Sequence, residues 1–421
     1  TSAEKNQMVR ANSSASGVYK FVINATTASG YSGAYEIQPK ANTAISMNLW
    51  GGPAENRGVG LWDKGDKNNV VEFVDAESFA ENLEKMSRTA LIPYPNKLDV
   101  KDGELPLASL SAIAYTGAGM KEHAEAFARQ LGISTGISLE VKEAGDAPSL
   151  GEIWFGTDET IAKEAYTMSV TSEGITVQAS EFGGWFYALQ TLKQLMPRNF
   201  FAGDKQSDAG AWTIPCLEIE DRPHLGHRGY MLDIARHFFN KEEVKKVLDI
   251  MALYKMNRFH WHLTDDQGWR IHIPEYPKLT EVGAIRKGSF ANNGDGQKFF
   301  DDTEYGRGMF YTLEDLRDIV AYAKARNIEI IPEVDLPGHM VAAVASYPEL
   351  SCDPSKKYEV RIDGGISKDV LNVGDDRVID FLKCVLGHVA TVFPYDYVHI
   401  GGDECPTDQW KTNQMCLDRV K

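Results

Sequence analysis

The sequence has little of what would tie it to a membrane, to a cysteine-based metal site or to a polyanionic partner. No stretch of about 18 consecutive apolar residues occurs, so the sequence contains no candidate transmembrane helix. The five cysteines are far apart and form no Cys-x-x-Cys pair, which leaves the redox compartment open. Basic residues are outnumbered, with Lys plus Arg at 44 against Asp plus Glu at 60 and a formal net charge of −16. Such a charge disfavours nucleic acid and anionic membranes as partners.

What remains is the composition of a globular protein with more than one domain. Hydrophobic residues make up 43% and charged residues 25%, and a length of 421 residues exceeds what one compact core usually holds. The chain begins at Thr1 without a charged segment followed by an apolar one. We therefore expect any export signal to have been removed or to lie outside this sequence. Nothing in the composition indicates an oligomeric state.

Two segments precede the region with regular periodicity. Residues 1–88 predict a β-rich module, because Gly, Ser, Asn and Asp separate short apolar runs. The stretch 45–73 is similar to one repeat of a β-trefoil lectin module, although a small β module or linker without a sugar site is the favoured interpretation. Residues 89–222 mix strands with amphipathic helices expected near 120–131 and 182–196. This mixture predicts a small α+β domain.

From residue 223 to residue 421, short apolar strands alternate with helices. Strands are expected at 230–234, 258–263, 328–334 and 397–401, and helices at 241–254, from Thr312 onward and at 378–392. Asp315, three residues after Thr312, is typical of a capping box. Repeated β-α units with nearly all-apolar strands predict a parallel sheet covered by helices, either a (β/α)8 barrel or a doubly wound sheet.

The positions of the polar residues favour the barrel. Every expected strand ends in a polar cluster: Asp233 and Arg236; His262, Asp265 and Asp266; Glu333, Asp335 and His339; Asp403 and Glu404. In a barrel, the loops at the C-terminal ends of the strands converge on one mouth, whereas a doubly wound sheet binds its ligand at one switch point. No glycine-rich phosphate loop follows the first strand. We therefore predict an α/β fold in which the chain contains about the first four units of a (β/α)8 barrel.

The pair Asp403-Glu404 is the sharpest chemical feature. It follows Gly401-Gly402 at the end of an expected strand. Two neighbouring carboxyls disfavour simultaneous ionisation, so one of them can keep a proton, as a general acid must. The glycines leave room for a substrate to approach the backbone. Taken alone, the stretch Gly401-Gly-Asp-Glu is more often a polar turn without chemistry.

Histidine, arginine and tryptophan side chains add further candidates. His260 and His262 alternate along a strand, so both imidazoles face one side. With carboxylates this spacing can hold a metal ion, but structural hydrogen bonds or sugar contacts are the favoured interpretation. Arg236 can hold sugar hydroxyls or pair with a carboxylate. We predict that Trp261 lies in the core and that Trp269, in a loop, is accessible.

Four stretches, taken together, resemble the family 20 glycoside hydrolases, the β-N-acetylhexosaminidases. They occur in the same order, and residues 91–221 also resemble the α+β domain that precedes the barrel in this family. The four stretches are Gly229-Tyr-Met-Leu-Asp-Ile-Ala-Arg-His-Phe, Met256-Asn-Arg-Phe-His-Trp-His-Leu-Thr-Asp-Asp-Gln-Gly-Trp-Arg, Ile331-Pro-Glu-Val-Asp-Leu-Pro-Gly-His and His399-Ile-Gly-Gly-Asp-Glu.

The resemblance implies an enzyme that removes terminal β-linked N-acetylglucosamine or N-acetylgalactosamine from glycans. It implies a retaining, substrate-assisted mechanism, in which the 2-acetamido oxygen of the substrate attacks the anomeric carbon and forms an oxazolinium ion. By position, Asp403 would orient the acetamido group and stabilise its developing positive charge. Glu404 would protonate the leaving oxygen and then activate water.

The resemblance also implies how the remaining polar residues take part. Arg236 would bind the 3- and 4-hydroxyls of the sugar, and His339 and Asp335 would support Glu404 and the −1 subsite. Asp265 and His262 would belong to the surrounding network. No metal or organic cofactor is implied, the partner is a glycan or glycoconjugate, and the location is periplasmic, extracellular or at the cell surface. Pocket residues that this family takes from later strands have no counterpart here, so we expect the C-terminal part of the barrel to be missing.

Two functions from other classes stay open. The first is a metal-dependent barrel hydrolase built on His260, His262 and the adjacent aspartates, whose activity would be lost on chelation. The second is a non-catalytic glycan-binding protein in which the N-terminal module performs the function. The intact Asp403-Glu404 pair counts against the second alternative.

Overall fold

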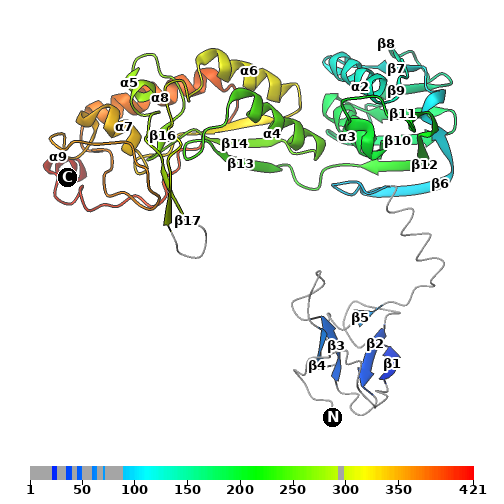
Figure 1. Cartoon of the computed structure of the whole chain (residues 1–421), viewed down its shortest axis with the longest axis horizontal. Helices are drawn as coiled ribbons and strands as arrows, with labels where there is room; N and C mark the ends of the chain where they lie inside the picture. Colours follow the sequence, from blue (N-terminus) through cyan, green and yellow to red (C-terminus); the bar gives the residue numbers. More distant parts are fainter. Residues whose placement is uncertain are drawn as a thin grey trace. The chain divides into compact units, whose positions relative to one another are not determined.

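The computed structural model describes residues 89–292 and 298–421 and five short strands nearer the N-terminus (Figure 1). These strands are β1 (Phe21–Ala25), β2 (Tyr35–Pro39), β3 (Ile45–Leu49), β4 (Val59–Asp63) and β5 (Val70–Val71). β2 pairs antiparallel with both β1 and β5, and β3 pairs antiparallel with β4. The residues between these strands, and with them the rest of the lectin-like repeat predicted at 45–73, lie outside the described residues.

The chain divides into two compact units, Thr1–Ser87 and Arg88–Lys421. The first part of the second unit contains a seven-stranded mixed sheet with the strand order β6-β12-β10-β11-β9-β7-β8. Its elements are β6 (Lys97–Pro106), β7 (Ala112–Tyr115), α2 (Met120–Thr135), β8 (Glu140–Glu143), β9 (Glu152–Thr157), β10 (Tyr166–Thr171), β11 (Gly174–Ala179), α3 (Phe182–Leu195) and β12 (Thr213–Asp221). The predicted helices are therefore present. The domain boundary near residue 222 stays a prediction.

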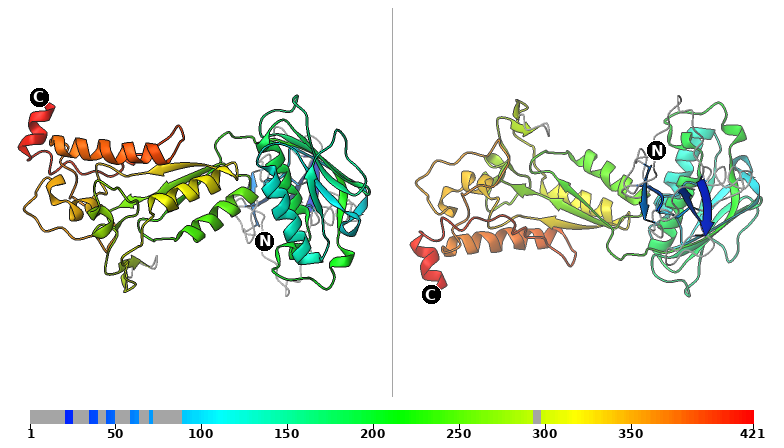
Figure 2. Two further views of the ribbon diagram at one scale, coloured as in Figure 1. Left: turned by 90° about the horizontal axis from the view of Figure 1, so that it is seen from above. Right: turned by 90° about the horizontal axis from the view of Figure 1, so that it is seen from below.

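Helices α2 and α3 pack on one face of this sheet (Figure 2). The face of α2 that the sequence predicts to be apolar is buried at Ala124, Phe127 and Leu131. Helix α3 approaches so closely that a Cβ on Gly184 would lie 2.3 Å from the carbonyl oxygen of Ala165. The combination of a mixed sheet with covering helices is an α+β arrangement, as predicted.

The second part contains three parallel strands in the order β13-β14-β19. They are β13 (Gly229–Asp233), β14 (Arg258–His262) and β19 (Glu329–Glu333), and their last residues, Asp233, His262 and Glu333, lie in register. The long helices α4 (Lys241–Leu253), α6 (Leu313–Lys324) and α8 (Asp376–Val392) lie on one side of these strands (Figure 1). This is the arrangement of successive units in a (β/α)8 barrel.

Capping boxes fix the starts of two of these helices. The side chain of Asn240 accepts the N–H groups of Glu242 and Glu243 at the start of α4, and that of Thr312 accepts the Asp315 N–H at the start of α6. Each box satisfies backbone donors that the first turn leaves unpaired. The capping box predicted at Thr312 is confirmed.

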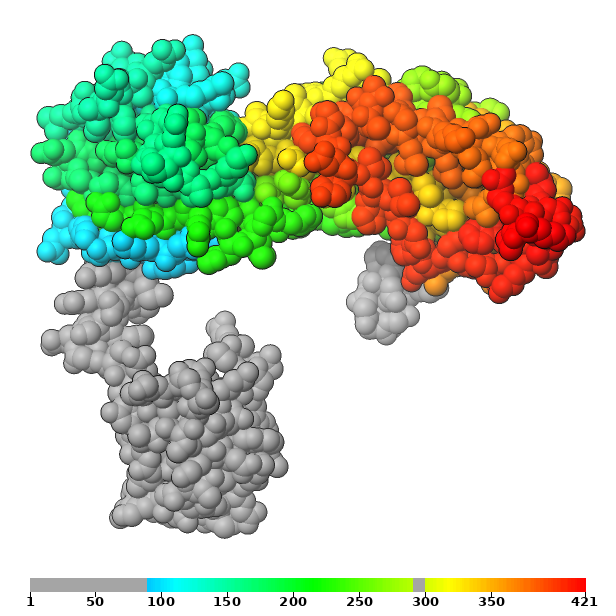
Figure 3. Space-filling view, turned by 180° about the vertical axis from the view of Figure 1, so that it is seen from behind, coloured from blue at the N-terminus to red at the C-terminus, as the bar shows by residue number. Residues whose placement is uncertain are grey.

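The predicted fourth strand is only partly formed. Residues 397–401 run beside β19, with the His399 N–H donating to Pro332 O at 2.9 Å and the Val334 N–H donating to His399 O at 3.1 Å. The pairing is nevertheless a single parallel bridge between Glu333 and His399. The extended backbone ends because Gly401 adopts a positive φ of 62°. On the face seen in Figure 3, α8 and the segment after it form much of the surface of this part.

Shorter elements connect the barrel units. They are β15 (Thr264–Asp265), β16 (Gly268–Trp269), α5 (Lys278–Glu281), β17 (Ser289–Asn292), β18 (Lys298–Asp301), α7 (Val341–Ser346) and α9 (Gln414–Val420). Trp261 is buried as predicted, but the prediction that Trp269 is accessible is wrong, because 1% of it is exposed. The tight β15–β16 hairpin folds Trp269 back toward Phe381 of α8. Among residues 89–292 and 298–421, no helix combines the length and apolar character needed to cross a bilayer.

Candidate active site

The polar residues that follow β13, β14 and β19 meet at one end of the sheet. Arg236 lies at the rim, where its guanidinium pairs with Asp233 at 2.8 Å and with Asp265 at 2.6 Å, and its Nε donates to Gln267 at 3.0 Å. Burial would lower the pKa of Arg236, but the charges of Asp265 and Asp233 raise it above its usual value. With its side chain 42% exposed, this arginine both pairs with carboxylates and remains accessible to a ligand.

Asp265 is the buried centre of the site. One of its oxygens contacts Arg236 and lies 3.0 Å from His262 Nε2, and the other lies 3.2 Å from His339 Nδ1. Burial alone would raise the pKa of Asp265, but hydrogen bonds from His262 and His339 and the charge of Arg236 lower it to about 2. Asp265 is therefore an anion at neutral pH.

His339 connects this anion to the two adjacent carboxyls. Its hydrogen bond to Asp265, the largest cause, raises the pKa of the imidazole to about 9. Within the described part of the chain, the buried Nε2 of His339 has no hydrogen-bond partner. This nitrogen lies 3.6 Å from Glu404 Oε2 and 3.9 Å from Asp403 Oδ2. At neutral pH, a cationic imidazole thus stands beside both carboxyls.

Asp403 and Glu404 are presented to solvent by a strained turn. Gly401 and Gly402 have positive φ angles of 62° and 94°, and Glu404 itself has a φ of 46°, which a residue other than glycine rarely adopts. The side chains of Asp403 and Glu404 are 62% and 57% exposed, in contrast to the buried Asp265 and His339. Both carboxyls are therefore accessible to a substrate.

Asp335 lies beneath this turn and accepts a hydrogen bond from the Gly402 N–H at 3.1 Å. Burial is the main cause that raises the pKa of Asp335 to about 7; the charge of Asp403 adds to it and the Gly402 N–H opposes it. Asp335 is thus a carboxyl of the site that titrates near neutral pH.

Position 401 requires glycine because its backbone lies very close to the side chain of Asp335. A Cβ on Gly401 would lie 1.9 Å from Asp335 Oδ1, at a backbone φ that also penalises alanine. We expect Gly401→Ala to destabilise the fold by about 1–3 kcal/mol and to displace Asp403 and Glu404. The control is Gly387→Ala in α8, where a Cβ meets nothing within 4 Å. We expect this control to be stabilising by about 0.5–1 kcal/mol in denaturant unfolding. Equal effects of the two substitutions would contradict the assignment of the turn.

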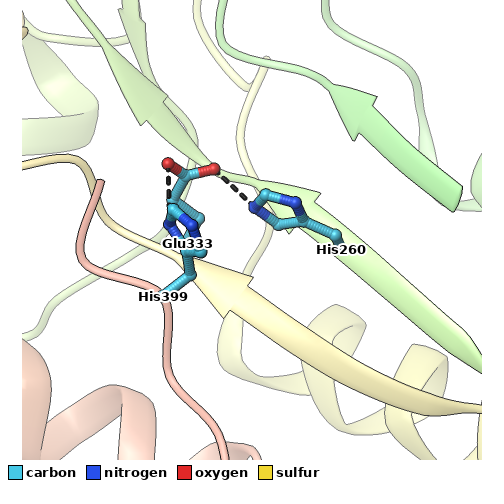
Figure 4. Close-up of side chains that lie close together, drawn as sticks. All are labelled: His260, Glu333 and His399. Carbon is cyan, nitrogen blue, oxygen red and sulfur yellow. Dashed lines mark hydrogen bonds and ion pairs between the residues drawn. The ribbon is translucent and has the colours of Figure 1, made fainter. Parts of the chain in front are cut away.

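Two further charged groups lie at the candidate site: Glu333, which the sequence places in a strand-end cluster without a role, and Arg361, which the sequence does not single out. Glu333 lies in a cluster with His260 and His399 (Figure 4) and also contacts His262. Arg361 pairs with Asp266 at 3.0 Å. Glu333 stands out in the sequence only as a strand end, and Arg361 lies in a long loop whose path the sequence does not reveal.

Four groups of side chains have possible metal-ligand atoms within 4.8 Å of one another: His260, Glu333 and His399; His262, Asp265 and Asp335; Asp265, Asp266 and His339; Asp335, His339 and Asp403. Hydrogen bonds with carboxylates raise the pKa of His262 to about 10 and that of His339 to about 9, against the opposing effect of burial. A protonated imidazole has no lone pair for a metal ion. Around His262 and His339, the arrangement therefore fits a network of ion pairs better than a metal site.

Two family models match successive parts of the chain. The model described as glycosyl hydrolase family 20, domain 2, matches residues 88–222, and the model described as glycosyl hydrolase family 20, catalytic domain, matches residues 225–421. A β-hexosaminidase of Porphyromonas gingivalis is 41% identical over 333 residues, which are 79% of this chain and 41% of that protein.

Solved structures give the same result. The family 20 exo-β-N-acetylglucosaminidase of Vibrio harveyi, in complex with N-acetylglucosamine, has a TM-score of 0.66 at 32% identity over 79% of this chain and 50% of that one. The N-acetyl-β-hexosaminidase of Streptomyces plicatus has a TM-score of 0.67 at 32% identity, over 79% of this chain and 63% of that one. The chain spans 41–50% of the β-hexosaminidases of P. gingivalis, Akkermansia muciniphila and Vibrio furnissii. With both models matched in succession, the chain belongs to glycosyl hydrolase family 20.

Proposed function

We propose that the protein containing this chain is a β-N-acetylhexosaminidase. It hydrolyses terminal β-linked N-acetylglucosamine or N-acetylgalactosamine by retaining, substrate-assisted catalysis. The observation that supports this best is the buried Asp265–His339 pair, whose free Nε2 lies 3.6 Å from the exposed Glu404. The names of the relatives agree, since they include β-hexosaminidases and an N,N'-diacetylchitobiase.

Glu404 is the general acid and base of the proposed reaction. It protonates the leaving glycosidic oxygen and later removes a proton from the attacking water. The anomeric carbon is displaced twice, first by the acetamido oxygen and then by water, so its configuration is retained. His339 stands beside Glu404 and stabilises its anionic form between the two steps. Asp265 keeps His339 oriented, because its oxygen accepts the Nδ1 hydrogen at 3.2 Å.

Asp403 acts on the substrate's 2-acetamido group. The acetamido oxygen attacks the anomeric carbon, and positive charge develops on the acetamido nitrogen as the oxazolinium ion forms. A carboxylate at this position orients the group and stabilises that charge. In a retaining enzyme with two carboxyl groups, these stand about 5–5.5 Å apart and flank the bond on opposite sides. Asp403 and Glu404 are adjacent in one turn, which suits a mechanism in which the nucleophile belongs to the substrate better than one in which a carboxylate attacks from the opposite side.

Arg236 and Asp335 complete the proposed −1 subsite. The forked donors of Arg236 suit the 3- and 4-hydroxyls of the sugar, since its side chain stays partly exposed while Asp233 and Asp265 hold its direction. Asp335 supports the turn before Asp403 through the Gly402 N–H. His262 holds Asp265 in place through the contact between its Nε2 and the Asp265 carboxylate. A periplasmic, extracellular or cell-surface location stays a prediction.

The test uses the longest natural polypeptide that contains this sequence. We expect hydrolysis of p-nitrophenyl β-N-acetylglucosaminide or β-N-acetylgalactosaminide, with the β-anomer as the first product in proton NMR. We expect Asp403→Asn to lower kcat by about 100–1,000-fold, as the loss of one preorganised stabilising group does. Asp408→Asn is the matched control, because Asp408 lies in the same segment and its side chain is also 62% exposed. An α-anomer as first product would contradict the mechanism.

A further inference from the structure

Glu333 is a buried carboxylate that no step of the proposed reaction uses. It ends β19 and is 4% exposed. One oxygen, Oε2, lies 2.6 Å from both His260 Nε2 and His262 Nδ1. The other, Oε1, lies 3.0 Å from His399 Nδ1, as Figure 4 shows for the His260 and His399 contacts. Three imidazoles, two from β14 and one from the segment 397–401, thus surround a single carboxyl group.

The contacts of His262 fix its charge. Its Nδ1 faces Glu333 at 2.6 Å and its Nε2 faces Asp265 at 3.0 Å. Ionised carboxylates only accept hydrogen bonds, so both ring nitrogens must carry hydrogen and the ring must be an imidazolium. Burial would raise the pKa of Glu333, but the hydrogen bonds from His260 and His262 hold it well below the usual range. Both neighbours of His262 are therefore anions.

Two chains of contacts lead from Glu333 to the catalytic pair. The first runs through His262 and Asp265 to His339, whose Nε2 lies 3.6 Å from Glu404. The second runs through His399, whose Nδ1 lies 3.0 Å from Glu333 Oε1 and 3.0 Å from the backbone nitrogen of Gly401, in the turn that precedes Asp403. Glu333 touches neither carboxyl of the pair, so any effect it has on the reaction passes through these neighbours.

We propose that Glu333 is a positioning residue for the reaction. It holds His262 as an imidazolium against Asp265, and Asp265 fixed in this way keeps His339 directed at Glu404. The inference rests on the proposed function. A binuclear or mononuclear metal site on His260, Glu333 and His399 is the competing use of the same cluster. The 2.6 Å contacts to one shared oxygen favour hydrogen bonds.

The proposal predicts the direction of a pH effect. The groups facing Glu333 are His260, His262 and His399. On its other side His262 faces Asp265, Asp335 and Arg236, and the charge of Asp233 also acts on it. Without the negative charge of Glu333, the pKa of His262 falls from about 10. His262 then loses its proton at a lower pH, and Asp265 loses a cationic partner. We therefore expect the activity of a variant without this charge to fall at a lower pH than that of the wild type.

The experiment compares kcat/KM against pH for the wild type, Glu333→Gln, Glu333→Asp and Glu329→Gln. We expect Glu333→Gln to move the basic limb down by about 1–2 pH units, the effect of removing one close opposite charge. Glu333→Asp keeps the negative charge and should move the basic limb less, although it changes the shape of the side chain more than Glu333→Gln does. Glu329→Gln is the control, because Glu329 lies on the same strand, is 43% exposed at its side chain and pairs with Arg258. Unchanged limbs in Glu333→Gln would overturn the proposal.

A direct measurement keeps the proposal falsifiable if the variants do not fold. Long-range nitrogen-15 NMR of the wild-type imidazoles, with His262 assigned through a His262→Asn variant, reports the protonation of both nitrogens. We expect imidazolium shifts for His262 from pH 6 to pH 9, and a neutral ring at pH 8 would overturn the proposal. Stoichiometric zinc or another metal ion that is lost in Glu333→Gln would overturn it in favour of the metal site. These readouts do not depend on hexosaminidase activity, so they can fail separately from the proposed function.

Discussion

Glu404→Gln is expected to lower kcat/KM by about 100–10,000-fold on substrates with a poor leaving group, such as chitobiose or an alkyl β-N-acetylglucosaminide. An alkoxide leaves only if it is protonated in the transition state, and glutamine cannot supply that proton. On an activated aryl glycoside the loss should be much smaller, because a phenolate with electron-withdrawing groups leaves without help. The measurement is kcat/KM on both substrate classes with the same preparation of enzyme.

The difference between the two classes is the informative result. Glu220→Gln serves as the control, because Glu220 lies on β12, far along the chain from the site, and its side chain is 60% exposed, close to the 57% of Glu404. This control should leave both rates unchanged. Equal losses on both classes in Glu404→Gln would mean that Glu404 is not the general acid, and His339 or Asp335 would then have to be examined for that role.

Local patterns in the sequence were enough to predict most of the fold. Apolar residues at helical spacing predict α4 and α8, and the Thr312–Asp315 pair predicts the start of α6. The prediction of a full fourth strand was wrong because the pairing of this strand depends on contacts that the hydrophobic pattern does not encode. The prediction that Trp269 is accessible was wrong for a similar reason. The hairpin of the two-residue strands β15 and β16 folds Trp269 into the core, and a position in an expected loop does not predict such a reversal of the chain.

The sequence predicts which residues come together at the candidate site, but it does not predict their contacts with one another. Parallel strands in register bring their C-terminal ends together, so Asp233, His262 and Glu333 become neighbours. What the sequence could not reveal is which carboxyl is buried between which cations. Asp265 and Glu333 are held as anions by imidazoles, whereas Asp335, buried beside Asp403, has its pKa raised to about 7. Such differences follow from burial and distance, which one sequence does not show.

Removing the 2-acetamido group from the substrate is expected to abolish turnover. In the proposed mechanism the nucleophile belongs to the substrate, and no carboxyl of the site replaces it, since Asp403 and Glu404 are consecutive residues of one turn. A well-oriented intramolecular nucleophile has an effective molarity of about 10⁵–10⁸ M, so its loss should cost at least about five orders of magnitude in rate. A thiazoline mimic of the cyclic intermediate should, by the same reasoning, bind far more tightly than N-acetylglucosamine.

The most direct test of the proposed mechanism is therefore kcat/KM for p-nitrophenyl β-N-acetylglucosaminide against p-nitrophenyl β-glucoside. The two substrates share the leaving group and the ring, and they differ at the 2-position alone. The proposed mechanism predicts ready hydrolysis of the first and no measurable hydrolysis of the second. Comparable rates on the two substrates would contradict it, because a nucleophile of the protein would then have to attack the anomeric carbon.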